Sequence, residues 1–202
     1  MPDFSQIFTL LFLMLGPFKL LGPFVKITKN TDQAFARKIA MRAILYSLAA
    51  LTLAAFLGGK MLSNFGIPVP ILTLSGGIIL FLVALLNVIK QFEPVKTQEV
   101  STGTPTLEVA LYPLAFPTIV TPYGIAAVIV FNTLTPDLRA KLIVGAIVAG
   151  IMFLNFLVMF FAKSLFRPLA LILAILGAIL GVIQVAVGAK IIYNSLVALL
   201  GS

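Results

Sequence analysis

The sequence contains no cysteine and no histidine among its 202 residues. Without cysteine, the chain has neither a disulfide framework nor a thiolate that could act as a nucleophile or metal ligand. Histidine is the commonest metal ligand and the usual general base near neutral pH. The two absences together lead us to expect no metal centre, no cofactor and no enzymatic activity.

Charged residues are also scarce. They make up 10% of the chain, against about a quarter in soluble domains. Hydrophobic residues make up 61%, and the mean hydropathy is +1.17. The apolar runs are continuous and do not alternate at every second residue, which favours membrane-spanning helices over a β-barrel. We therefore expect an all-α integral membrane protein.

Acidic residues are the rarest charged group. The six fall near the ends of apolar runs or in polar connections: Asp3, Asp32, Glu93, Glu99, Glu108 and Asp137. A relay of buried carboxylates, common in proton pumps, is therefore excluded. The net charge is +8, but most basic residues flank apolar segments, so we expect them to orient the chain in the bilayer and not to bind nucleic acid.

Six apolar runs are long enough to cross a bilayer, which takes roughly 20 residues. They are Phe4–Ile27, Phe35–Leu57, Ile67–Ile89, Leu107–Phe131, Leu142–Phe161 and Leu169–Tyr193. The longest polar stretch separates the third run from the fourth. We therefore divide the chain into a three-span repeat (residues 1–90), a cytoplasmic linker (91–106) and a second three-span repeat (107–202).

A faint duplication relates the two halves at an offset of about a hundred residues. Pro17 matches Pro117, Pro68 matches Pro168, and the glycine-rich runs Gly76–Leu80 and Gly177–Gly181 correspond. Because each half has an odd number of spans, the second half must lie inverted relative to the first. Inverted repeats of this kind are typical of secondary transporters.

The basic residues also predict an orientation. Most lie in the first, third and fifth connections: Lys26, Lys29, Arg37, Lys38, Arg42, Lys90, Lys96, Lys163 and Arg167. The second and fourth connections carry only Lys60, Arg139 and Lys141. Cytoplasmic loops are enriched in Lys and Arg, so we expect a plasma (inner) membrane protein with both termini outside the cytoplasm.

Two spans contain residues that a plain anchor helix avoids. Gly16–Phe24 reads Gly-Pro-Phe-Lys-Leu-Leu-Gly-Pro-Phe, and prolines and a glycine recur from Pro113 to Gly124. Proline removes a backbone donor and breaks a helix, so we expect spans one and four to be discontinuous. The restarting helix would present free N–H groups to an anion at the membrane centre. The alternative is that these prolines only kink the helices for packing.

Lys19 lies well inside the first span, where a charged side chain costs about 2.5–3.5 kcal/mol. It could bind a substrate carboxylate, lose its proton in a dry environment, or simply reach a water-filled vestibule. Central polar side chains of other spans join it as candidates. The predicted substrate-binding set is Pro17, Lys19, Gly22, Pro23, Pro117, Thr118, Thr121, Pro122, Gly124, Asn155 and Gln184.

Three stretches resemble the MarC family: Gly16–Phe24, Ser75–Phe81, and Pro113–Pro117 followed by Thr121–Gly124. The resemblance covers nearly the whole chain, and it implies six spans and a relation to the LysE-type exporter superfamily. It also implies a neutral amino-acid transporter or a protein associated with multiple resistance. Lys19 stands where many members have glycine, and Thr121 and Tyr123 stand where the second motif usually has glycine.

Together these features predict a secondary transporter or exporter of small metabolites, with neutral amino acids as the expected class, that works by alternating access at a midplane site between two broken helices. A channel or facilitator for small solutes and a non-transporting membrane subunit are the alternatives. The expected partners are the lipid bilayer, a small-molecule substrate and, if transport is coupled, Na⁺ or H⁺. The sequence leaves the oligomeric state open.

Overall fold

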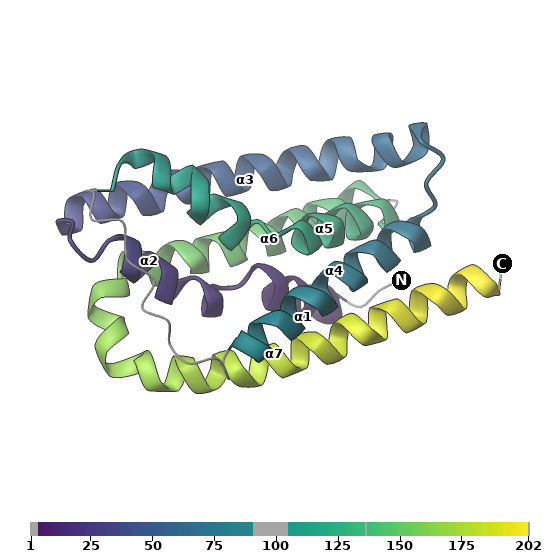
Figure 1. Ribbon diagram of the computed structural model, residues 1–202. Coiled ribbons are helices and arrows are strands. Elements are labelled where there is room, and N and C mark those ends of the chain that lie inside the picture. The colour runs from purple at the N-terminus through teal and green to yellow at the C-terminus, as the bar shows by residue number, and fades with distance from the viewer. Residues whose placement is uncertain (1–3, 91–104, 136, 202) are drawn as a thin grey trace.

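The computed structural model describes residues 4–90, 105–135 and 137–201, with the backbone alone for residues 90, 163–174, 176 and 177. All regular structure in these ranges is helical, and the long helices form one elongated bundle (Figure 1). The elements are α1 (Phe4–Leu15), η1 (Pro17–Lys19), α2 (Leu21–Ile27), α3 (Gln33–Asn64), α4 (Val69–Lys90), η2 (Leu107–Ala110), η3 (Leu111–Ile119), α5 (Pro122–Leu134), α6 (Leu138–Phe160) and α7 (Ala162–Leu200). The expected all-α class is confirmed.

The described helices agree with the predicted spans. Five segments are long and apolar enough to cross a membrane, and a sixth is present if the bent pair Leu107–Ile119 and Pro122–Leu134 forms one span. The first segment, Phe4–Ile27, coincides with the predicted first span. The predicted linker lies almost entirely outside the described residues, so the proposed division of the chain into two halves stays a prediction.

The predicted fifth connection is wrong in one respect. Only Phe161 separates α6 from α7, so Lys163 and Arg167 belong to the beginning of a helix of 39 residues and not to a loop. A helix satisfies its own backbone hydrogen bonds. It therefore continues beyond the apolar residues that mark the span in the sequence, and hydropathy alone places its start too late.

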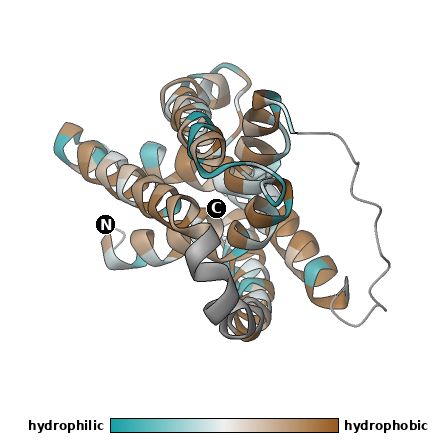
Figure 2. Ribbon diagram, turned by 90° about the vertical axis from the view of Figure 1, so that its left-hand side faces the viewer, coloured by the Kyte–Doolittle hydropathy of each residue, from teal (hydrophilic) through white to brown (hydrophobic). Residues whose placement is uncertain are grey.

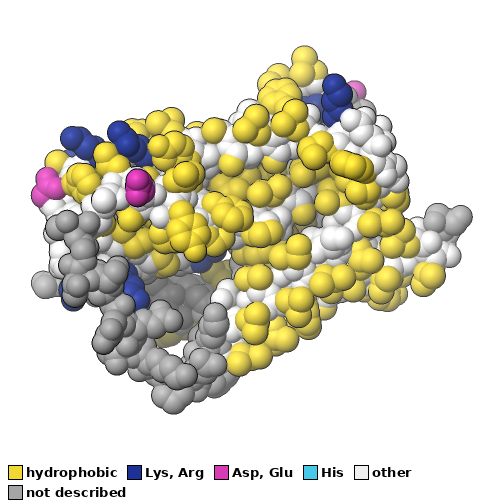
Figure 3. Space-filling view, turned by 45° about the horizontal axis from the view of Figure 1, so that its top comes forward, with side chains coloured by type: hydrophobic (Ala, Val, Ile, Leu, Met, Phe, Trp, Pro, Cys, Tyr) yellow, Lys and Arg dark blue, Asp and Glu magenta, His cyan; other side chains and the backbone are white. Residues whose placement is uncertain are grey.

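The surface of the bundle is largely apolar. Hydrophobic residues predominate along most of the helices (Figure 2), and the space-filling view shows many hydrophobic side chains on the face that it presents (Figure 3). Among them, the side chains of Phe56 and Leu142 are 79% and 65% exposed. Soluble proteins rarely expose so large an apolar surface, which fits helices that face lipid.

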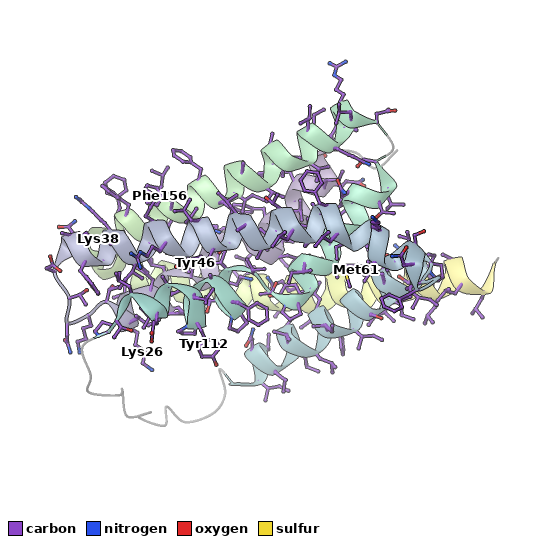
Figure 4. All side chains as sticks on the ribbon, turned by 90° about the horizontal axis from the view of Figure 1, so that it is seen from above. Lys26, Lys38, Tyr46, Met61, Tyr112 and Phe156 are labelled. Carbon is purple, nitrogen blue, oxygen red and sulfur yellow. The ribbon has the colours of Figure 1, made fainter. Side chains whose placement is uncertain are left out.

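The beginning of α1 and the end of α7 point toward the same end of the bundle, which also carries the α3–α4 and α5–α6 connections (Figure 1). Lys26 and Lys38 lie at the opposite end, where α2 leads into α3 (Figure 4). The structure thus separates the basic first connection from the two termini. Which end faces the cytoplasm stays a prediction.

Corresponding elements of the two predicted halves contact each other: α1 packs on α5, α3 on α6, and α4 along α7. A pseudo-twofold axis between two inverted repeats would produce such pairs. The contacts fit the proposed duplication, which stays a prediction.

The α4–α7 contact depends on glycine. A Cβ added at Gly188 would lie 2.8 Å from both the backbone N and Cα of Phe81. Small residues let membrane helices approach closely in this way. We expect Gly188→Ala to lower the free energy of unfolding by about 1–3 kcal/mol, because the helices must move apart.

Unfolding of the purified protein in mixed micelles at increasing SDS concentration would measure this effect. Gly150→Ala is the matched control, since a Cβ at Gly150 meets no atom within 4 Å. Equal stability of the two variants would contradict the close α4–α7 contact.

Candidate functional site

The first predicted break is present, and Pro17 explains it. Helix α1 ends at Leu15, Gly16 is extended (φ −73°, ψ 172°), and η1 leads into α2. Pro17 has no N–H, so the carbonyl of Leu13, four residues earlier, loses its helical partner. A Cβ at Gly16 would lie 2.1 Å from the carbonyl oxygen of Phe12. Glycine therefore permits the tight exit from α1.

Side chains from distant parts of the chain satisfy the carbonyls that the break leaves free. Gln184 of α7 donates from Nε2 to the Leu13 oxygen at 2.6 Å, and Asn155 of α6 donates from Nδ2 to the Leu15 oxygen at 2.8 Å. Lys19 donates from Nζ to the oxygen of Met14. Each unsatisfied carbonyl would cost several kcal/mol in a bilayer. The end of α1 is thus capped from three directions.

Lys19 is held between the two halves of the chain. Besides the Met14 carbonyl, its Nζ lies 3.4 Å from the hydroxyl of Tyr123 in α5 and 5.3 Å from the centre of that ring. The C-terminus of a helix carries about half a negative charge. The sequence offered no acidic partner for Lys19, and the structure supplies this helix end and an aromatic face instead.

The second predicted break lies between η3 and α5, whose axes differ by 64°. Thr121 is extended and caps α5, because its Oγ1 accepts a hydrogen bond from the Gly124 N–H at 3.1 Å. Pro122, the first residue of α5, has no N–H. The first three residues of α5 therefore carry two backbone donors, and that of Gly124 is bound to Thr121, which leaves the N–H of Tyr123 for a ligand. The anion-binding capacity of this helix start is therefore smaller than we expected.

The two breaks meet inside the bundle. A Cβ at Gly124 would lie 2.6 Å from Cδ2 of Leu15, so the first turn of α5 packs on the end of α1. We call Lys19, Tyr123, Asn155 and Gln184, with the terminal carbonyls of α1, the polar cluster. It places the negative end of one half-helix beside the positive end of another, an arrangement that transporters use to bind charged groups.

The structure assembles only part of the predicted set. Pro17, Thr121, Gly124 and Asn155 are buried, and Lys19 and Gln184 are partly buried, all at or next to the polar cluster. Gly22, Pro23, Pro117 and Pro122 are exposed.

The remaining predicted residues lie apart for simple reasons. Helix α2 begins at Leu21 and runs through Gly22 and Pro23, so the first span restarts earlier than predicted. Proline is tolerated there because N–H groups in the first turn have no helical partner. A Cβ at Gly22 would meet no atom within 4 Å, so this glycine mediates no close approach. Thr118 donates to the Pro113 carbonyl at 2.8 Å and so binds its own backbone.

Asn155 carries the unsatisfied atom of the cluster. Its side chain is fully buried, and its Oδ1 has no hydrogen-bond partner among the described residues. A carbonyl can only accept, so the amide NH₂ must face the Leu15 oxygen and Oδ1 must point elsewhere. A buried acceptor without a partner is costly. Asn155 therefore offers a free acceptor for a ligand donor.

Tyr123 belongs to the polar cluster, but the predicted set omitted it. Its position directly after Pro122 in the second break was the available signal, because a restarting helix directs its first residues at the break. Lys19 and Tyr123 are also positions where the two motifs differ from the usual glycine of the MarC pattern. The structure places these two side chains in contact, with Lys19 Nζ 3.4 Å from the Tyr123 hydroxyl.

Comparison with known proteins agrees with the motifs and the fold. The family model described as "MarC family integral membrane protein" matches residues 1–200. The chain belongs to the MarC family. The resemblance inferred from the sequence motifs is thereby confirmed. The long apolar helices of the bundle are those of a multi-spanning MarC membrane protein.

Curated relatives in the MarC family come from archaea and bacteria. A UPF0056 membrane protein of Methanocaldococcus jannaschii is 27% identical over 195 residues, which is 96% of this chain and 95% of the relative. A UPF0056 membrane protein of Aquifex aeolicus is 26% identical over 203 residues, covering 97% and 95%. The UPF0056 inner membrane protein YhgN of Escherichia coli K12 is 30% identical over 141 residues, 69% of each chain. No solved structure matches this chain.

Proposed function

We propose that this MarC protein is a secondary transporter that moves small neutral amino acids through the polar cluster by alternating access. One observation carries the proposal. In a bundle covered by apolar side chains, Lys19 and Asn155 donate to neighbouring carbonyls at the end of α1, and the amide oxygen of Asn155 stays buried and unpaired. Such polar groups are costly at membrane depth and usually mark a substrate path.

The cluster is complementary to a zwitterion. Lys19 Nζ and the Tyr123 hydroxyl can donate to a carboxylate, and Asn155 Oδ1 can accept from an ammonium group. Acidic residues lie only near span ends or in connections, so no carboxylate would pair with a second positive charge on the substrate. This combination favours amino acids with neutral side chains. The resemblance to the MarC family, which implies a neutral amino-acid transporter, supports the same substrate class.

Substrate binding would also loosen the contact between the halves. A carboxylate at Lys19 would compete with the Met14 carbonyl and the Tyr123 hydroxyl, which hold Lys19 between η1 and α5. Releasing Lys19 from α5 would let the broken helices move relative to each other, as alternating access requires.

Counterflow in proteoliposomes tests this function. Vesicles with purified protein would contain about 5 mM unlabelled alanine, a concentration in the range of the Kd of a weak site. Trace labelled alanine would then be added outside. We expect transient, saturable accumulation that serine and glycine inhibit and that lysine and glutamate do not. Flux that never saturates would indicate a channel instead. No protein-dependent uptake of any amino acid would contradict the proposed substrate class.

We further propose that the protein resides in the plasma (inner) membrane with both termini outside the cytoplasm. The separation of Lys26 and Lys38 from the chain ends and the name of the Escherichia coli relative as an inner membrane protein support this. A terminal epitope tag should be cleaved by protease added to intact spheroplasts. Protection of both termini would overturn the orientation.

A further inference from the structure

A groove of about 590 Å³ lies between α3, α5 and α6, away from the polar cluster. Leu51, Phe56, Val128, Leu142, Gly145 and Val148 are among its lining residues. We call it the lateral groove. None of the four side chains of the polar cluster lines it, so it needs its own explanation. Its volume lies in the usual range for ligand sites, about 300–1,000 Å³.

The lateral groove has the length of one leaflet. Its lining on α6 runs from Leu138 to Ala149, which spans about 16 Å at a rise of about 1.5 Å per residue. Half the hydrocarbon thickness of a bilayer is about 15 Å. The groove begins near the α5–α6 connection, at the end of the bundle that carries the chain termini, and extends toward the middle of α6.

The groove opens to the side of the bundle and not to an internal path. Phe56, Leu138 and Leu142 line it and are all strongly exposed, with Leu138 at 74%. Exposed apolar side chains at this depth face acyl chains. An empty groove would forfeit dispersion contacts along its walls, and its largely apolar lining offers few partners to water.

Lys141 is the charged residue of the lining, and it lies at one end. Lys141 lines the groove in the first turn of α6 and is exposed, whereas Arg139 is exposed in the same turn but does not line the groove. Asp137 is the acidic residue of this helix start, so the two cations outweigh it. Farther in, Asn132 already donates to the Ala55 carbonyl at 2.6 Å. The groove is thus apolar along its length and positive at its mouth.

We propose that the lateral groove binds a phospholipid with an anionic headgroup, one acyl chain along α6 and the phosphate at Lys141. The length fits one leaflet, the lateral opening fits entry from the bilayer, and the charge fits an anionic headgroup. Basic side chains near a membrane surface each strengthen the attraction to anionic lipid. The proposal is independent of the transport function.

Native mass spectrometry of the full chain, titrated with phosphatidylglycerol or phosphatidylcholine in micelles, tests the site. We expect one tight phosphatidylglycerol per chain. Lys141→Ala should weaken it by about fivefold and leave phosphatidylcholine unaffected. Gly145→Leu should weaken both lipids, since the added side chain enters the groove; a Cβ at Gly145 meets no atom within 4 Å.

Two matched controls keep the test specific. Lys190→Ala removes an exposed lysine from α7, which does not line the groove. Gly150→Leu adds the same side chain to α6 where a Cβ also meets no atom within 4 Å, outside the groove. Both should bind like the wild type. Equal losses in Lys190→Ala and Lys141→Ala, no preference for phosphatidylglycerol, or unchanged binding by folded Gly145→Leu would each overturn the proposal.

If Gly145→Leu fails to fold, the comparison of Lys141→Ala with Lys190→Ala still tests whether the lateral groove binds an anionic lipid. Thermal unfolding of each variant in detergent micelles identifies such a failure before any lipid is added. Loss of phosphatidylglycerol binding in Lys141→Ala alone supports the site, and equal binding by the two lysine variants overturns it.

Discussion

Replacing Lys19 by methionine is expected to lower the initial rate of alanine counterflow by about 100-fold, the value of a charge-assisted hydrogen bond of about 3 kcal/mol. Methionine keeps an unbranched stem of similar length and removes only the amine. The substrate carboxylate then lacks its cationic partner, while the apolar contacts of the stem are retained.

The same substitution should change stability much less than transport. The Met14 carbonyl loses its donor, but an expensive intramembrane charge is removed as well. Lys26→Met is the matched control, because Lys26 is exposed in α2 at the end of the bundle, and it should transport like the wild type. Normal transport by a folded Lys19→Met protein would remove Lys19 from the substrate site.

Replacing Asn155 by leucine is expected to reduce counterflow by at least about tenfold while leaving the free energy of unfolding within about 1 kcal/mol of the wild type. Two effects on stability oppose each other. The Leu15 carbonyl loses its donor at 2.8 Å, and the buried unpaired Oδ1 disappears. Each is worth about 1–3 kcal/mol, so they largely cancel. Transport has no such compensation, because the acceptor for the substrate ammonium is gone.

Asn132→Leu is the matched control for this prediction. Asn132 also donates its amide across two helices, from Nδ2 to the Ala55 carbonyl at 2.6 Å, but it lies outside the polar cluster. This variant should be destabilised by about 1–3 kcal/mol and should keep the wild-type affinity for alanine. SDS unfolding and counterflow, measured on both variants, separate the two roles. A structural role for Asn155 would instead produce a strongly destabilised protein with unchanged alanine affinity.

The breaks of the helices were predictable from the sequence because proline acts locally. Pro17 removes a donor and Gly16 permits the tight exit, so the end of α1 follows from two neighbouring residues. Gly22 and Pro23 do not mark the break itself, because α2 already begins at Leu21 and a proline in the first turn of a helix costs no hydrogen bond. Their contact with a substrate stays a prediction. The chemistry of proline depends on its position within the helix, and hydropathy does not reveal that position.

The partners of the broken helix could not be predicted. The acceptors at the end of α1 are backbone carbonyls, which every residue carries, so no side-chain pattern marks them. Their donors come from far away: Asn155 lies 140 residues from Leu15, and Gln184 lies 171 residues from Leu13. The lateral groove is equally hidden, since its walls belong to three helices with ordinary apolar sequences.

The sequence by itself determined that this chain is a helical membrane protein of the MarC family, with two broken spans and a lysine inside the first. Those features follow from composition and from residues adjacent in the chain. Only the tertiary structure decided that Lys19 rests on the end of α1 and against Tyr123, that Asn155 keeps an unpaired oxygen, and that a groove lies between α3, α5 and α6. Helix packing sets these contacts, because it chooses which faces of distant helices meet.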